Sequence, residues 1–176
     1  MKKILILIAF LFSVIGASAQ KFAFVDSEYI LKHMPEYKSA LSQLDGSSNQ
    51  WQTQVELKFK EVERLYKSYQ ADQVLLSEEI RRRRENEIVE TEKEAKEFQR
   101  SKFGPEGELF KLRNELIKPI QNKVSDAIAT LAKSKYIDFV FDRGSDATMM
   151  IYANSSYDLS NEVIIKLGYK PGTVVN

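Results

Sequence analysis

The sequence predicts an α+β fold, in which a small β body of three short strands carries a long antiparallel α-helical hairpin as a coiled-coil-like arm. Three observations lead to this prediction. Strand-like segments stand near both ends of the chain, a heptad pattern fills its middle, and charge is dense but balanced, with 26 Lys and Arg against 25 Asp and Glu. Dense, balanced charge is typical of long solvated helices.

Residues 1–19 have the pattern of a secretory signal peptide. A basic start, Met1–Lys3, precedes the apolar run Ile4–Ile15, and Ala17–Ala19 fits an A-x-A cleavage site. The apolar run is shorter than the ~20 residues that a membrane-spanning helix needs. We therefore expect cleavage and a mature domain, residues 20–176, outside the cytoplasm; an uncleaved anchor is the alternative.

Composition limits the partners of this mature domain. Without the two lysines of residues 1–19, 24 basic residues face 25 acidic ones, a net charge of −1. This charge argues against nucleic acid as a partner, because nucleic-acid binding needs a basic excess. The chain has no cysteine, so we expect neither disulfides nor lipid attachment at a cysteine.

The first strand is expected at "KFAFV" (21–25), followed by a short helix that breaks at Pro35. The arm is expected over residues 36–133, and the β body over 21–35 and 134–170. Apolar residues recur in the first half of the arm at alternating steps of three and four, as in a coiled coil. This seam comprises Leu41, Leu44, Ser48, Trp51, Val55, Lys58, Val62, Leu65 and Tyr69.

A helix of ~40 residues would be ~60 Å long, so it must project from a domain of this size. We expect a tight turn at 75–77, where Ser77 is suited to N-cap the returning helix. "FGPEG" (103–107) should interrupt this helix, since Gly and Pro are poor helix formers. A second seam follows at Leu109, Leu112, Leu116, Ile120, Val124, Ala127 and Leu131.

Strand periodicity returns after the arm. "YIDFVFD" (136–142) and "ATMMIYA" (147–153) read as the two arms of a β-hairpin around the turn "RGSD". A last helix should be N-capped by Ser160 and ended by Gly168. So small a sheet has open edges and buries little apolar surface, which predicts association of several copies. The expected oligomerisation residues are Phe22, Phe24, Ile120, Val124, Phe139, Phe141, Met149 and Ile151.

Several segments together resemble the Skp/OmpH family of periplasmic chaperones. They are "FAFVDSEYIL…MPEY", "ELIKPIQNKVSDAIATLAKSKYIDFVFD" and "YDLSNEVIIKL", and the resemblance spans residues 21–168. It implies a homotrimer whose three arms enclose a cavity. Unfolded outer-membrane β-barrel proteins would be held there without ATP until membrane assembly.

Client contacts are expected near the turn and the helix break, where apolar side chains are hardest to bury. The predicted client-binding residues are Val74, Leu75, Leu76, Ile80, Arg81, Arg82, Arg83, Arg84 and Phe103. The four arginines circle the helix, so they fit either a solvated arm or a ring that attracts acidic clients or membrane phosphates. The resemblance also implies lipopolysaccharide binding, but the neutral charge of this chain allows only a weak lipopolysaccharide or membrane-surface contact.

We expect no enzymatic activity, no cofactor and no metal site. His33 is the only histidine, and it reads as a surface or hinge residue rather than a general base. "GPEG" lacks the Gly-Lys-Ser/Thr of a phosphate-binding loop. The alternative function is that of a structural or adaptor coiled-coil protein of the cell envelope, without client-holding activity.

Overall fold

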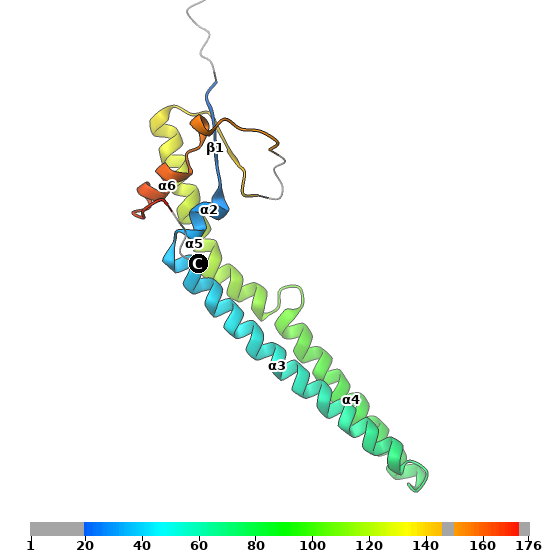
Figure 1. Cartoon of the computed structure of the whole chain (residues 1–176). Helices are drawn as coiled ribbons and strands as arrows, with labels where there is room; N and C mark the ends of the chain where they lie inside the picture. The colour runs from blue at the N-terminus through cyan, green and yellow to red at the C-terminus, as the bar shows by residue number, and fades with distance from the viewer. Residues whose placement is uncertain (1–19, 146–149, 173–176) are drawn as a thin grey trace, which may run out of the picture. The chain divides into compact units, whose positions relative to one another are not determined.

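The computed structural model describes residues 20–145 and 150–172. Their contacts divide the chain into two compact units. We call Met34–Lys123 the arm, and the remaining described residues, 20–33 and 124–172, the body. Figure 1 shows the order of the elements along the chain.

The sheet of the body contains two parallel strands, β1 (Phe22–Val25) and β2 (Phe139–Asp142), with Phe22 paired with Phe139. Both strands were predicted, but their pairing was not. Parallel strands require a long crossover connection, and the helices between β1 and β2 provide it.

The predicted β-hairpin is therefore wrong in the described residues. Residues 150–153 form no strand, and the side chains of Ile151 and Tyr152 are 93% and 84% exposed. They thus lack the packing that stabilises a strand. The rest of this predicted third strand, 147–149, lies largely outside the described residues.

Besides the last part of α5 (Glu108–Lys135), the body contains two short helices, α2 (Ser27–Lys32) and α6 (Ser160–Lys166). A short 3₁₀ turn, η1 (Ser155–Tyr157), precedes α6. Asp26 N-caps α2, because its Oδ1 accepts a hydrogen bond from the Tyr29 N–H at 2.9 Å. The helices α2 and α6 contact each other. Their buried side chains, together with β1, form the core: Ala23, Phe24, Val25, Ile30, Leu31, Leu159, Val163 and Ile164.

The ends of α6 confirm one prediction and correct another. Gly168 has a φ of +89°, and the Gly168 and Tyr169 N–H groups bond to the carbonyls of Ile165 and Ile164, as in a Schellman motif. Ser160, however, is the first helical residue and not the N-cap. Its hydroxyl accepts a hydrogen bond from the Asp26 N–H at 2.8 Å, so its side chain links the start of α6 to the N-cap residue of α2.

The arm contains α3 (Pro35–Asp72), α4 (Glu78–Phe103) and the first part of α5 (Glu108–Lys135). The helices α3 and α4 pack along each other as a hairpin (Figure 1). The predicted seam of α3 is confirmed, since its members are buried or half-buried, apart from Leu41. The seam of α5 is also confirmed, and Ile120, Val124 and Ala127 are buried. None of the helices in residues 20–145 and 150–172 is long and apolar enough to cross a membrane.

The break at "GPEG" is confirmed and is a tight, hydrogen-bonded turn. The Gly107 N–H donates to the Gly104 carbonyl at 2.9 Å. A Cβ atom at Gly107 would lie 2.9 Å from the carbonyl oxygens of Gly104 and Lys102, and Glu106 has a φ of +60°. The backbone thus requires glycine at position 107.

Candidate functional site

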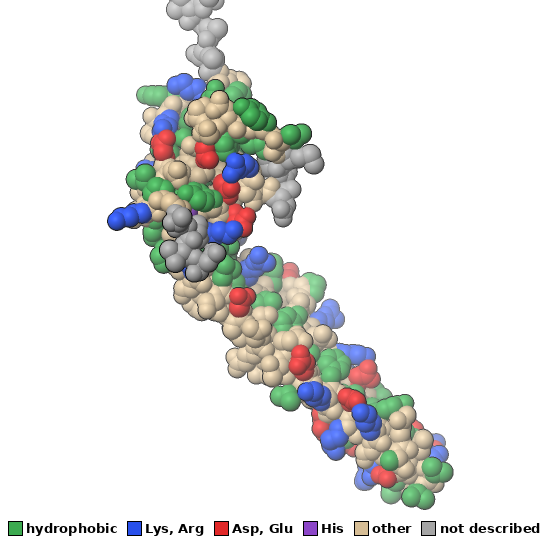
Figure 2. Space-filling view, viewed as in Figure 1, with side chains coloured by type: hydrophobic (Ala, Val, Ile, Leu, Met, Phe, Trp, Pro, Cys, Tyr) green, Lys and Arg blue, Asp and Glu red, His purple; other side chains and the backbone are tan. Residues whose placement is uncertain are grey.

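The first candidate surface is the tip of the arm, the turn of residues 73–77 between α3 and α4. Val74 and Leu75 are 84% and 88% exposed, whereas Ile80 is 38% exposed and Leu76 is half-buried. Figure 2 shows apolar side chains at this end of the hairpin. Ser77 is the N-cap of α4, as predicted, although its side chain makes no capping hydrogen bond.

The four arginines next to this turn are not equivalent. Arg81 and Arg84 are half-buried, whereas Arg82 and Arg83 are exposed. An Arg84 Nη1–Asp72 Oδ2 contact of 3.0 Å joins the two helices. Three of the four have acidic partners, because Arg81 and Arg82 both pair with Glu78. Within the described part of the chain, Arg83 is the arginine of this run whose side chain makes no ion pair or hydrogen bond.

Phe103 belongs to the packing of the arm. Its half-buried ring contacts Trp51 edge to face, with the ring centroids 6.5 Å apart. The Lys102 Nζ lies 5.1 Å from the centre of the Trp51 ring, and the Lys58 Nζ lies 5.4 Å from that of Phe98. The structure therefore places Phe103 in an aromatic and cationic cluster between the helices, away from Val74 and Leu75 along α4.

Other apolar side chains of the arm were missed by the sequence analysis. Each lies off the predicted seams and has half or more of its surface exposed. A search for apolar residues that the heptad pattern leaves facing solvent would have found them: Leu57, Val89 and Phe110, which are 59%, 58% and 53% exposed.

Hydrogen bonds along the arm perturb its titratable groups. The Tyr69 hydroxyl donates to Glu85 across the hairpin, and this bond raises the pKa of the phenol. The side-chain hydrogen bonds from Arg64 and Lys67 lower the pKa values of the Glu61 and Glu63 carboxyls, respectively. These groups therefore stabilise the arm near neutral pH.

The second candidate surface is an aromatic face of the sheet in the body. Phe22, Phe139 and Phe141 are each about half exposed, and the Phe22 ring stacks on those of Phe139 and Phe141 at centroid distances of 5.6 and 6.4 Å. The strands alternate, so the opposite face carries Ala23 and Val25, which are buried.

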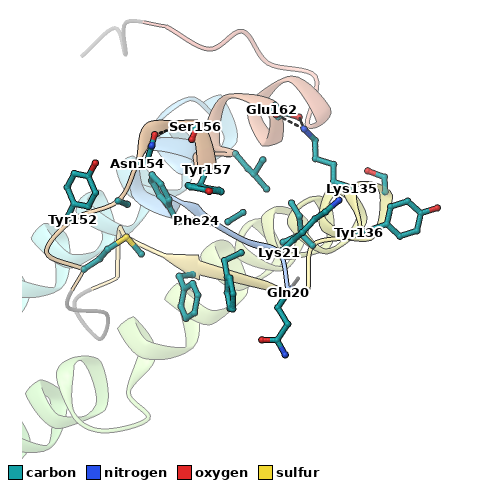
Figure 3. Close-up of a pocket in the computed structure, with 18 residues that line it drawn as sticks. Gln20, Lys21, Phe24, Lys135, Tyr136, Tyr152, Asn154, Ser156, Tyr157 and Glu162 are labelled. Carbon is teal, nitrogen blue, oxygen red and sulfur yellow. Dashed lines mark hydrogen bonds and ion pairs between the residues drawn. The ribbon is translucent and has the colours of Figure 1, made fainter. Parts of the chain in front are cut away.

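An open groove of about 910 Å³ lies on this aromatic face (Figure 3). Phe22, Phe24 and Phe141 line it from the strands, and Tyr152 and Tyr157 from the segment after β2. Lys135 and Glu162, which also line the groove, form an ion pair with an N–O distance of 2.7 Å. Aromatic side chains thus line much of the groove, and two of its charged groups, Lys135 and Glu162, are paired with each other.

The predicted oligomerisation residues divide into two groups. Phe22, Phe139, Phe141 and Ile151 are exposed, so another chain can reach them. Phe24, Ile120 and Val124 are 4%, 8% and 4% exposed, because they belong to the core of this chain itself. Met149 lies outside the described residues.

The described residues gather no three His, Cys, Asp or Glu side chains as a metal site would require. His33 lies at the end of α2, with its ring nitrogens 2.8 Å and 2.9 Å from the carbonyl oxygens of Tyr29 and Gly172. The arrangement of both candidate surfaces is suited to apolar binding.

Comparison with known proteins identifies the family. The family described as OmpH, outer membrane protein (OmpH-like), matches residues 21–167. No curated protein matches the chain. A similar solved structure is the crystal structure of a candidate outer membrane chaperone (OmpH-like) from Caulobacter crescentus CB15; the identity is 12%, the TM-score is 0.64, and 86% of each chain is covered. That likeness shows a shared fold, and the match over residues 21–167 shows that this chain belongs to the OmpH-like family.

Proposed function

We propose that this chain is an ATP-independent periplasmic holdase, which binds unfolded outer-membrane β-barrel proteins and prevents their aggregation before membrane assembly. Its family and the chaperone named among its structural relatives support the client class. The observation that carries the proposal is the exposure of large apolar side chains on an otherwise charged helical hairpin, above all Val74 and Leu75 at 84% and 88%.

These side chains suit a holdase because an unfolded barrel protein presents alternating apolar residues. Fully burying one Leu or Val side chain contributes about 1.5–3 kcal/mol. Dispersed contacts of this size hold a client through their number, and each can be released separately. A single tight pocket would fit few client sequences.

Charge has a smaller part in the proposed binding. Arg81, Arg82 and Arg84 already have acidic partners, which leaves Arg83 as the arginine of this run available to an acidic group of a client. Exposed charges are also screened beyond ~10 Å at 0.1 M salt. Because residues 20–176 have a net charge of only −1, they would make at most a weak contact with lipopolysaccharide or a membrane surface.

The holdase is proposed to work as a homotrimer associated through the bodies. A two-stranded sheet is only marginally stable alone, and one of its faces exposes Phe22, Phe139 and Phe141. Covering this face with neighbouring copies would stabilise the sheet. Residues 1–19 are proposed to be the signal peptide that directs the chain to the periplasm.

The proposal is tested by diluting a urea-unfolded outer-membrane β-barrel protein with and without residues 20–176 and following light scattering. The holdase should suppress scattering without ATP, and the V74S/L75S variant should be less effective at equal concentration. The matched control is R82Q/R83Q, which changes two exposed side chains next to the same turn and should reduce the suppression of scattering less than V74S/L75S does. Unchanged scattering with the wild-type chain would contradict the proposal.

A structural or adaptor coiled coil is the second candidate. The continuous seam between α3 and α4 favours it, because such packing alone suffices for a rigid spacer. A spacer would leave client aggregation unchanged, so the same assay separates the two functions.

A further inference from the structure

His33 is the C-cap residue of α2 and the last residue of the body before the arm. Its backbone N–H bonds to the Ile30 carbonyl at 3.0 Å, instead of the Tyr29 carbonyl that an α-helical turn would use. The His33 side chain replaces that bond, because its Nδ1 lies 2.8 Å from the Tyr29 oxygen. The ring therefore caps the end of α2.

The other ring nitrogen reaches a distant part of the chain. The His33 Nε2 lies 2.9 Å from the carbonyl oxygen of Gly172, in the segment that follows α6. Both neighbours of the ring are carbonyl oxygens, which only accept hydrogen bonds. A neutral imidazole has one N–H, so only the imidazolium cation can donate to both oxygens.

We propose that protonated His33 acts as a latch that ties residues 170–172 to the end of α2, and that loss of its proton releases this segment. The deprotonated ring would keep one hydrogen bond and direct a lone pair at the second carbonyl oxygen. Histidine is the side chain whose charge ordinarily changes between pH 5 and 8, so a comparison of the protein across this pH range tests the latch.

Neighbouring side chains hold the ring in this position. The Tyr29 ring contacts His33 edge to face, with centroids 4.4 Å apart, and the Tyr29 hydroxyl is held by Asn161 at 3.0 Å.

The charged groups on the neighbouring elements are engaged elsewhere or have the same sign as the imidazolium. On α2, Glu28 pairs with Lys32 at 2.6 Å; Glu162 of α6 pairs with Lys135 at 2.7 Å. Lys170 is the charged side chain of residues 168–172. The two carbonyl oxygens thus remain the acceptors that hold the ring.

Release is expected to be local. The Gly168 and Tyr169 N–H groups bond to the α6 carbonyls of Ile165 and Ile164 at 2.9 Å and 3.0 Å, and neither bond involves His33. These two residues should stay ordered at every pH at which the body is folded, and they provide an internal control for Gly172.

The experiment is nuclear magnetic resonance of residues 20–176 with ¹⁵N-labelled backbone and imidazole. His33 is the only histidine, so its ring signals need no assignment by mutation. At about pH 5.5 both ring nitrogens should be protonated and the order parameter of Gly172 should be about 0.85; at about pH 8 one nitrogen should be protonated and the value should fall below about 0.6. An unchanged order parameter at Gly172, while the ring loses its proton, would overturn the proposal.

Two variants separate charge from shape. H33R carries a permanent cation with several donors and should keep Gly172 ordered at both pH values. H33F has a ring without a hydrogen-bond donor and should leave Gly172 mobile at both. Circular dichroism checks that each variant is folded, and a wild-type pH response in H33F would show that another group controls the segment.

Discussion

The rings of Phe22 and Phe139 stack at directly paired positions of two parallel strands, with their centroids 5.6 Å apart, while about half of each side chain stays exposed. The opposite face of β1 is buried. The sheet is thus packed on one side within the chain, and the aromatic side is available to another copy.

F139D should prevent association while leaving the chain folded. A carboxylate at this half-exposed position remains hydrated in the monomer but would be buried and unpaired in an interface, at a cost of several kcal/mol. Sedimentation equilibrium should give about three monomer masses for the wild type and one for F139D, with helical circular dichroism retained. I165D, which adds the same charge to an exposed side chain of α6, is the control and should remain associated. A wild-type monomer at tens of micromolar would contradict the trimer.

The tip variants should separate apolar from electrostatic binding. V74S/L75S removes the two most exposed apolar side chains of the turn and should weaken client affinity about ten-fold, equivalent to about 1.4 kcal/mol. R82Q/R83Q should weaken it less than three-fold. Fluorescence titration of a labelled unfolded barrel protein measures both affinities, and the opposite ranking would show that capture is electrostatic.

Two glycine-to-alanine changes should have opposite effects on stability. Gly46 lies inside α3, and a Cβ added there would meet no atom within 4 Å beyond its own helical backbone and chain neighbours. G46A should therefore stabilise the arm by about 0.5–1 kcal/mol. At Gly144 a Cβ would lie 2.8 Å from both the Asp26 Oδ1 and the Glu28 nitrogen; G144A should cost about 1–3 kcal/mol. Urea unfolding at one fixed protein concentration measures both changes, and equal effects would contradict this assignment.

The Tyr69 hydroxyl should ionise at a higher pH than that of an unperturbed tyrosine. Its hydrogen bond to Glu85 raises the pKa of the folded phenol, so the resulting stability is complete below the unfolded value of about 10 and is lost as pH rises through the folded value. A titration of absorbance at 295 nm should lose its most alkaline component in Y69F. If Y69F removes a component that titrates near pH 10, the hydrogen bond does not persist in solution.

The sequence predicted the helices well because their signals are local. The seam through Trp51 and Val55 and the break at "GPEG" follow from spacing and from the conformational limits of Gly and Pro. The facing seam of α4 was missed, since it contains Arg81, Arg84 and Lys102, which are half-buried in the structure. Long cationic side chains pack through their aliphatic stems, so a search for regularly spaced apolar residues does not find them.

Strand pairing and the candidate surfaces were harder to predict because they depend on distant residues. Spacing identified β1 and β2 but favoured a local hairpin over their parallel pairing. Hydrophobicity likewise selected Phe24 and Phe22 together, although Phe24 is covered by its own chain and Phe22 is half exposed. Periodicity shows that a side chain needs burial, not whether its own chain or a neighbour supplies it.

The parallel pairing of β1 with β2 makes the entire helical hairpin an insertion between two halves of one sheet. The Lys21 N–H donates a hydrogen bond to the Asp138 carboxylate, 117 residues further along the chain. During synthesis, the body therefore cannot fold until nearly the whole polypeptide has been made. Loop-closure entropy rises only about 0.6 kcal/mol for each doubling of loop length. Evolution can therefore lengthen or shorten the hairpin by matched heptads in α3 and α4, and so change its reach, while the sheet that closes it remains the same.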